Sequence, residues 1–420
     1  MSFETFFEAQ SFMLWAVFII ALVMGAVVNK TNFCTMGAVS DFVNMGDTGR
    51  MRAWFLAMAV AILGVTLLEY TGLLNLSGSF PPYRNSNIVL AENILGGLMF
   101  GIGMTLASGC GNKCLVRIGG GNLKSIIVFL IVGALAYFMI NPFPGSDKTI
   151  YSVLFYGWTN PMSVDVLKPQ DIGSLVGGSE PSAMRLIAGV VIFLAMGHFI
   201  FKSKEFRSSA DNMIGGAVVG LAVLAAWYVS GNVIVDADGE ILSLQQYYNQ
   251  WDMLADSDAG KPAAGAMLAT QSYTFINPMG QALNYLAGGL DGSLMTFGVV
   301  AVFGVVAGSL IWSLISRSFR IEWFNSASDV ANHVIGAILM GIGGTLAMGC
   351  TIGQAVTGIS TLAVGSILTF GAIFLGSALT MKIQYYKMVY EDEATVLKAL
   401  ITGLVDLKLL PESMRKLDAI

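Results

Sequence analysis

The sequence predicts an all-α polytopic membrane protein with about nine transmembrane helices, short re-entrant helices and an inverted internal repeat. Three observations support this fold class. Charged residues make up only 12% of the chain, against roughly 25% in ordinary soluble domains, so most of the exterior has to face lipid. Apolar stretches long enough to cross a bilayer recur along the chain. One long sequence pattern also returns at a fixed interval.

Nine apolar stretches reach the roughly 17–25 residues that a helix needs to span a bilayer. They cover about 11–28, 52–73, 94–112, 123–141, 183–201, 212–230, 294–316, 332–350 and 363–384. Two further segments, 33–46 and 274–290, are apolar but too short to span, and both are rich in Gly or Asn. We expect these two to re-enter the membrane, which irregular backbone does only where it is buried in protein or lines a cavity.

The distribution of Lys and Arg predicts the orientation. If the spans alternate, 17 of the basic residues fall on one side and 5 on the other. Because Lys and Arg accumulate on the cytoplasmic side, we expect a periplasmic N-terminus and a cytoplasmic C-terminus in a bacterial inner membrane. The polar loops 142–182 and 231–271 then lie outside the cell membrane. No basic cluster indicates binding of nucleic acid.

The repeated pattern is the strongest local signal. Gly96–Cys110 reads GGLMFGIGMTLASGC and Gly336–Cys350 reads GAILMGIGGTLAMGC, with nine identities in fifteen positions at an offset of 240. A weaker match relates FCTMGAVSDF (33–42) to FINPMGQALNY (275–285), which places Ile276 opposite Cys34. The distribution of Lys and Arg predicts that these two segments enter the membrane from opposite sides, so we expect the two halves to be inverted relative to one another. Inverted repeats place substrate sites near the membrane midplane.

The repeat divides the chain into four parts. These are a first half with its linking helices (1–230), an extracytoplasmic loop (231–271), a second half (272–384) and a cytoplasmic tail (385–420). The tail carries acids at 391–393 and then an amphipathic helical pattern. It lacks cysteine, so we expect it either to dock a partner or to pack on the bundle.

The cysteines are the candidate functional residues. Cys110 and Cys350 occupy equivalent repeat positions after Gly, and Cys34 sits beside its own Met-Gly element. The alternative for each is a small buried apolar side chain. Cys114 has Gln354 at its equivalent position, so it is mainly structural and only a possible secondary site residue. The spacing of Cys110 and Cys114 does not favour zinc, and we predict neither a metal nor another cofactor.

Thiols suit the passage of a small sulfur anion. A thiol is small and polarizable with a weak S–H donor, so it can hold the sulfur of thiosulfate or a persulfide without trapping it. Helix N-termini can carry the anion's charge without a fixed cation. Lys113 and Arg117 follow Cys110 toward the cytoplasm and are secondary candidates for drawing the anion out. Ordinary positive-inside charge is the alternative interpretation of both residues.

Three motifs carry a family resemblance. At NFCTMGA (32–38), SGCGNKCLVRIGGGNLKS (108–125) and MGCTIGQ (348–354) the chain resembles the YeeE/YedE family, and the likeness covers roughly 12–384. The resemblance implies nine transmembrane helices plus four short ones in an hourglass. It also implies three functional cysteines, which fall on Cys34, Cys110 and Cys350. A TusA-like cytoplasmic sulfur carrier protein is the partner that the resemblance implies.

Together these observations predict a transporter, not an enzyme, that takes up thiosulfate or a related small sulfur-containing anion. Three alternatives stay open. The same fold could pass a selenium or sulfide species, or a membrane thiol enzyme could transfer sulfane sulfur covalently. Covalent transfer needs a thiolate stabilised by nearby positive charge. The third alternative is a structural or assembly subunit in which the cysteines are dispensable.

Overall fold

The computed structural model describes residues 1–177, 180–237, 239–250 and 268–418, which are mostly helical. Within them, nine helical segments are long and apolar enough to cross a membrane, as the sequence predicts. Seven are single helices: α3 (Gly49–Tyr70), α6 (Leu123–Ile140), α10 (Pro181–Lys202), α12 (Ala210–Asn232), α15 (Phe297–Ile315), α16 (Ala327–Leu346) and α17 (Val364–Tyr390).

The other two segments are composite. The first joins α1 (Phe6–Thr31), α2 (Thr35–Ser40) and the π-helical turn η1 (Asp41–Met45). The second joins the π-helical turn η2 (Glu92–Gly96), α4 (Gly97–Leu106) and α5 (Gly111–Gly119). The predicted re-entrant segments correspond to α2 with η1 and to α14 (Ile276–Ala287).

Large apolar side chains face outward along the long helices. On α10 the side chains of Ile187, Val191 and Leu194 are 55%, 60% and 62% exposed. A surface of this kind is unfavourable in water but matches the hydrocarbon core of a bilayer. The chain is therefore a multi-pass membrane protein.

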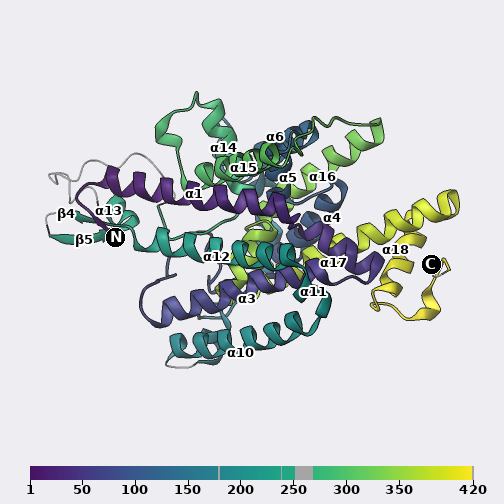
Figure 1. Cartoon of the computed structure of the whole chain (residues 1–420), viewed down its shortest axis with the longest axis horizontal. Coiled ribbons are helices and arrows are strands. Elements are labelled where there is room, and N and C mark those ends of the chain that lie inside the picture. Colours follow the sequence, from purple (N-terminus) through teal and green to yellow (C-terminus); the bar gives the residue numbers. More distant parts are fainter. Residues whose placement is uncertain (178–179, 238, 251–267, 419–420) are drawn as a thin grey trace.

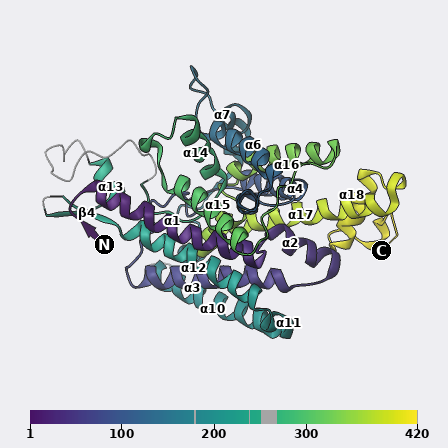
Figure 2. The same ribbon diagram turned by 45° about the horizontal axis from the view of Figure 1, so that its top comes forward.

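The long helices run roughly along one direction of the molecule (Figure 1). α1, α12, α3 and α10 lie side by side in that order, as the two views agree (Figures 1 and 2). The two chain termini lie at opposite ends of the bundle, which we call the N-terminal end and the C-terminal end (Figure 1). α1 also packs against α15, so the predicted halves interleave.

The two copies of the repeated pattern contact one another through glycines. The backbone at Gly96 approaches Gly343, and a Cβ added at Gly96 would lie 2.8 Å from the Gly343 carbonyl oxygen. In the same way, a Cβ added at Gly103 would lie 2.6 Å from the Gly336 carbonyl oxygen. From one end of the contact to the other, residue numbers rise in α4 and fall in α16, so the two helices are antiparallel. The contact is also reciprocal, because Gly96 and Gly336, like Gly103 and Gly343, are equivalent positions of the repeat.

Both copies end in the same turn. The helices stop at Leu106 and Leu346, and Ser108 and Met348 then adopt the left-handed conformation with φ of 59° and 56°. The predicted spans 94–112 and 332–350 are therefore not continuous helices up to their last residues. The apolar character continues through Gly-Cys, but the helix does not. Each cysteine begins the next short helix instead.

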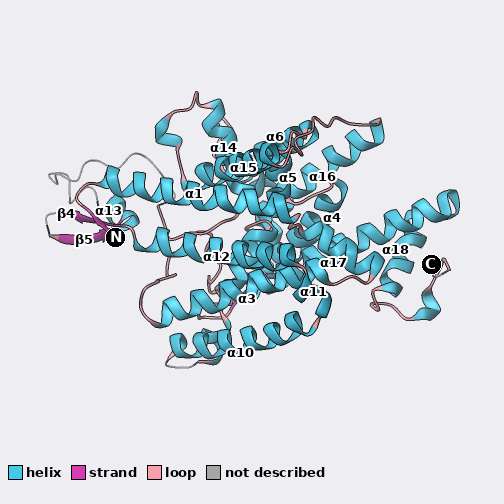
Figure 3. Cartoon of the chain, in the orientation of Figure 1, coloured by secondary structure: helices cyan, strands magenta, loops and turns pink. Residues whose placement is uncertain are grey.

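Short elements cover the N-terminal end (Figure 3). β1 (Ser2–Phe3) pairs in parallel with β4 (Ile234–Ala237), which pairs antiparallel with β5 (Glu240–Ser243), while β2 (Asn87–Val89) pairs with β3 (Ser163–Asp165). The short α-helices of the loops are α7 (Ile150–Leu154), α8 (Tyr156–Thr159), α9 (Ile172–Val176) and α13 (Leu244–Asn249). A fifth short helix, α11 (Lys204–Ser208), joins α10 to α12 toward the C-terminal end (Figure 1). Single 3₁₀ turns are η3 (Asn160–Met162) and η5 (Gly292–Leu294). Part of the predicted loop 231–271 lies outside the described residues.

The C-terminal segment forms a small lobe. α17 continues to Tyr390, beyond the predicted boundary of the tail, and is followed by η7 (Glu391–Glu393), α18 (Val396–Asp406) and η8 (Glu412–Met414). Tyr386 and Ala399 are among the buried residues of this lobe. Asp406 ties it to α17 through Lys382 at 3.3 Å. The predicted amphipathic helix of the tail thus packs on the end of α17.

Candidate functional site

Three cysteines begin three short helices. The backbone carbonyl of Cys34 accepts the Ala38 N–H at 3.0 Å at the start of α2, and that of Cys110 accepts the Cys114 N–H at 2.9 Å at the start of α5. The carbonyl of Cys350 accepts the Gln354 N–H at 2.7 Å, where the π-helical segment η6 (Ile352–Gly358) follows. The first N–H groups of a helix have no partner within it, so each cysteine stands at a partially positive helix end.

The three helix starts converge. Cys110 lies close enough to both Cys34 and Cys350 for electrostatic interaction. The Cys350 sulfur accepts the Gly353 N–H at 3.4 Å and also interacts with the backbone N–H of Phe275, which begins α14. Ile276 completes the group, because a Cβ added at Gly111 would lie 3.0 Å from its Cδ1 atom. The structure thus brings Ile276 to the position beside the three cysteines that the repeat predicts.

The thiols are free but enclosed. Cys34, Cys110 and Cys350 are 6%, 2% and 0% exposed, and none of the described cysteines is in a disulfide. Among the described residues, no three His, Cys, Asp or Glu side chains are arranged to hold a metal ion. The three thiols are therefore enclosed by the protein.

Buried polar side chains without a regular hydrogen bond gather at the same helix starts. Thr35 follows Cys34, Asn112 lies two residues after Cys110, and Thr351 follows Cys350, and each carries a buried oxygen without a hydrogen-bond partner. Thr274 and Gln354 add two more such oxygens. The hydroxyls of Thr351 and Thr274 approach the thiols of Cys110 and Cys350, but neither makes a hydrogen bond of regular geometry. Buried polar atoms are normally paired, so this cluster indicates a place for a polar ligand or water.

The secondary candidate residues Cys114, Lys113 and Arg117 each have contacts of their own. The Cys114 thiol donates to the backbone carbonyl of Ser125 at 3.1 Å, which ties α5 to the start of α6. Lys113 donates to the Asn32 side chain at 3.2 Å and lies near both Cys34 and Cys110. Arg117 and Lys113 line a cavity of about 480 Å³ at the C-terminal end of the bundle, together with Lys30, Arg320 and Glu322. This cavity therefore carries four basic side chains and one acidic one.

Further cavities approach the cysteines from both ends. At the C-terminal end, a cavity of about 380 Å³ is lined by Met36 and Ser108, each two residues from one of the cysteines. At the N-terminal end, a cavity of about 350 Å³ is lined by Pro82 and by Met348, which is two residues before Cys350. Each cavity thus includes a residue two positions from one of the three cysteines.

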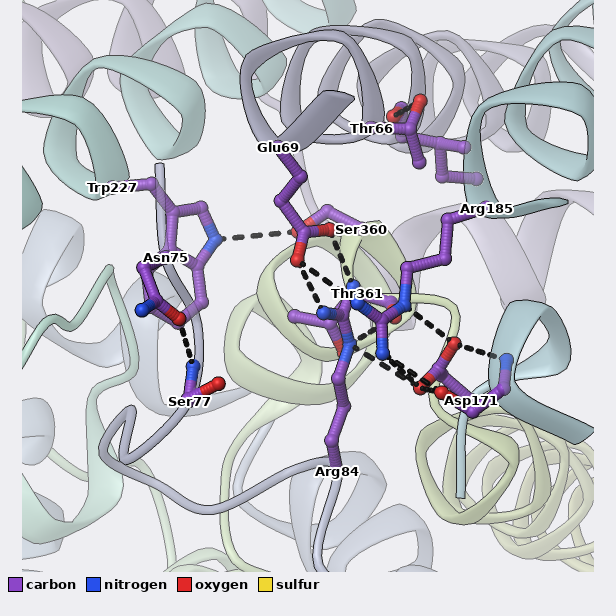
Figure 4. Close-up of polar contacts among 12 residues, drawn as sticks. Thr66, Glu69, Asn75, Ser77, Arg84, Asp171, Arg185, Trp227, Ser360 and Thr361 are labelled. Carbon is purple, nitrogen blue, oxygen red and sulfur yellow. Dashed lines mark hydrogen bonds and ion pairs between the residues drawn. The ribbon is translucent and has the colours of Figure 1, made fainter. Parts of the chain in front are cut away.

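A buried ionic cluster of Glu69, Arg84, Asp171 and Arg185 lies at the N-terminal end (Figure 4). Arg84 donates to both carboxylate oxygens of Glu69 at 2.5 and 2.7 Å, and Arg185 donates to both oxygens of Asp171 at 2.8 and 2.9 Å. Burial alone would raise the pKa of Asp171. The hydrogen bond from Arg185 and the charge of Arg84 outweigh burial and hold that pKa below its ordinary value of 3.8. The cluster could not be predicted from the sequence, because its members belong to no motif.

The arrangement brings together groups that favour a small anion, and the Lys113 ammonium lies near Cys34 and Cys110. Helix N-termini supply positive potential and N–H donors, the free thiols offer weak S–H donors to a polarizable atom, and hydroxyls are present for oxygens. The roles of Cys34, Cys110 and Cys350 stay predictions, but the structure places all three at one point.

Comparison with known proteins agrees with this architecture. A family model described as sulphur transport matches residues 30–379. Over 372 residues the chain is 23% identical to the thiosulfate transporter TsuA of Spirochaeta thermophila, covering 87% of this chain and 97% of that protein. It is also 23% identical over 341 residues to the thiosulfate transporter TsuA of Escherichia coli, covering 79% of this chain and 83% of that one.

Proposed function

This chain belongs to the sulphur transport family, and from that membership we propose that it takes up thiosulfate or a closely related sulfur anion through a path lined by Cys34, Cys110 and Cys350. The resemblance to the YeeE/YedE family is thereby confirmed. The family and the names of the relatives indicate a transporter, not an enzyme. The membrane is the bacterial inner membrane, with the N-terminal end in the periplasm.

The observation that carries the proposal is the meeting of three free thiols at three helix starts. Transport needs binding that is strong enough to admit the ion and weak enough to release it. A weak S–H donor beside a helix N-terminus meets both needs, because the charge is stabilised by dipoles and no salt bridge holds the ion. The anion would move from one cysteine to the next when a local opening of the short helices exposes each thiol to it in turn.

The basic cavity lined by Lys113 and Arg117 supports the direction of transfer. It lies at the C-terminal end, where the sequence predicts the cytoplasm. An anion leaving the cysteines in that direction meets positive charge, which favours its departure. We therefore assign these two residues to release and Cys114 to the packing of α5 on α6.

The test is uptake of radiolabelled thiosulfate, and growth on it as sole sulfur source, in a host without its own uptake systems. Wild-type protein should restore both. Cys34→Ala, Cys110→Ala and Cys350→Ala should each lower uptake about tenfold or more, because a hydrogen bond to a charged partner is worth about 1.5–3 kcal/mol. Cys114→Ala is the matched control. It removes only a bond to a backbone carbonyl, so uptake should persist with a loss of about 1 kcal/mol in stability.

Two results would contradict the proposal, once membrane expression is verified. If all four cysteine variants transport as wild type does, the thiols are packing groups and the path is not lined by them. If expressed wild-type protein restores neither uptake nor growth, thiosulfate is the wrong substrate, and a selenium or sulfide species becomes the leading candidate.

A TusA-like sulfur carrier is the partner we propose on the cytoplasmic side, on the strength of the family resemblance. Removing the carrier gene from the host should slow growth on thiosulfate while leaving the initial rate of thiosulfate uptake unchanged. Unchanged growth would show that no such carrier is needed.

A further inference from the structure

Tyr83 carries a buried hydroxyl without a partner. Its side chain is 2% exposed, yet its phenolic oxygen makes no hydrogen bond in the structure. Other buried aromatic side chains of this region are satisfied: the Tyr273 hydroxyl donates to the Val17 carbonyl at 2.7 Å, and the Trp227 indole N–H donates to Ser360 at 3.3 Å. Leaving a buried hydroxyl unpaired costs free energy, so its retention calls for a function.

Tyr83 lies against the helix that begins at Cys350. A Cβ added at Gly358, in η6, would lie 3.1 Å from the Tyr83 Cδ1 atom, so the glycine leaves room for the ring. Tyr83 is also near enough to Cys350 for electrostatic interaction. Just before it, Pro81 and Pro82 line the cavity at the N-terminal end that Met348 also lines. Tyr83 thus lies near Cys350, and the two residues before it line that cavity.

The segment around Tyr83 is held firmly on both sides. Before it, the Phe80 N–H donates to the Thr270 carbonyl at 3.0 Å. After it, Arg84 bonds to Glu69 and donates through Nε to the Thr361 carbonyl at 2.8 Å (Figure 4). The ionic cluster therefore fixes the backbone beside Tyr83 to the chain just past η6. A polar group placed so firmly, with its own oxygen unpaired, is preorganised for a ligand.

We propose that Tyr83 is a substrate-binding residue on the N-terminal side of Cys350, and that its hydroxyl donates a hydrogen bond to an oxygen of the anion. The inference rests on the proposed function and narrows its substrate class. The ligand is a small oxyanion that presents a terminal sulfur to the Cys350 thiol and an oxygen to Tyr83. Thiosulfate has both ends, whereas sulfide and selenide have no oxygen to accept the bond.

The test is Tyr83→Phe, which removes one oxygen atom and keeps the ring. The KM for thiosulfate uptake should rise about tenfold, as expected for the loss of a hydrogen bond to a charged partner. The melting temperature of the purified, substrate-free protein should stay the same or rise, because no bond is lost. The upward shift of that temperature on adding thiosulfate should shrink. Tyr386→Phe is the matched control. Its side chain is also 2% exposed, but its hydroxyl bonds to Asp406 at 2.8 Å in the C-terminal lobe.

For Tyr386→Phe we expect a lower melting temperature with an unchanged KM. If Tyr83→Phe gives that same pattern, Tyr83 is structural and the inference fails. Cys350→Ala, measured in parallel, separates this failure from failure of the proposed function. Loss of uptake in Cys350→Ala with normal KM in Tyr83→Phe overturns only the role of Tyr83. Normal uptake in both variants overturns the thiol path as well.

Discussion

Two cysteines near the start of α5 have different neighbours, and their predicted roles differ accordingly. Cys110 and Cys114 are one helical turn apart, and both are buried. The Cys114 thiol donates a hydrogen bond to the Ser125 carbonyl, whereas Cys110 lies near Cys34 and Cys350. The repeat allowed this distinction to be predicted, because Cys110 has a cysteine at its equivalent position and Cys114 has Gln354.

Tyr83 shows where prediction from sequence stops at this scale. It lies in an irregular loop without a counterpart in the other half, so no periodicity or repeat singles it out. The lack of a partner for its hydroxyl is a property of the packed structure alone. The same holds for the ionic cluster, whose acids and arginines come from four separate parts of the chain.

Asp171 gives a pH-dependent prediction. Its pKa is lower in the folded protein than the ordinary 3.8, so its contribution to stability is complete above pH 3.8 and is lost as the pH falls through the folded value. We expect the melting temperature in detergent to fall steeply below that pH. Asp171→Asn should be less stable at pH 7 by about 3–5 kcal/mol, because it leaves buried arginine charge unpaired, and should show a shallower acid decline.

Asp147→Asn is the control for this pH series, since Asp147 is an exposed acid in the same loop. Its acid decline should match that of the wild type. An identical decline in Asp171→Asn would show that the cluster does not govern acid stability.

At the scale of elements, the sequence predicted where helices exist better than where they stop. Hydropathy identified all nine spans found among the described residues, since long apolar stretches are needed to cross a bilayer. Hydropathy extended two of the predicted helices past Cys110 and up to Cys350, because Gly, Ala and Cys are as apolar in a turn as in a helix. The turn itself depends on the left-handed conformation of Ser108 and Met348, which cannot be predicted from the residue types alone.

The crossing of α4 and α16 gives a prediction about paired glycines. Gly103→Ala and Gly336→Ala should each destabilise the protein by about 1–3 kcal/mol, because the new methyl group would lie 2.6 Å from a carbonyl oxygen of the other helix. The two variants should lose similar amounts of stability, since Gly103 and Gly336 lie against each other's carbonyl oxygens. Thermal unfolding in detergent measures the loss.

Gly371→Ala, in α17, is the matched control, because nothing lies within 4 Å of the added methyl group. It should unfold at or above the temperature of the wild type. If Gly103→Ala were equally stable, the close approach of α4 and α16 would not hold in the membrane.

For the whole molecule, the sequence predicted the fold class and the central meeting of short helices but not the interleaving of the halves. α1 belongs to the first half by position, yet it packs along α15 of the second, through the close approach of Gly25 to Val305 and of Gly308 to Leu22. Small residues permit such contacts in membranes, but their partners are not encoded in any one segment.

Orientation is a prediction for the whole molecule. Green fluorescent protein fused after Ile420 should fluoresce, and alkaline phosphatase fused there should be inactive, if the C-terminal end is cytoplasmic. Fusions made after Asn141 should give the reverse pattern. Active phosphatase at the C-terminus would invert the assignment and, with it, the direction proposed for the basic cavity.

The enclosed thiols have a consequence for the cell that carries this protein. Cys350 and Ile276 are both 0% exposed where the short helices meet. If the anion path runs through this point, as proposed, we expect a resting copy to block protons as well as anions. A cell could then keep many copies in an energised membrane and still preserve the proton-motive force when no sulfur source is present outside.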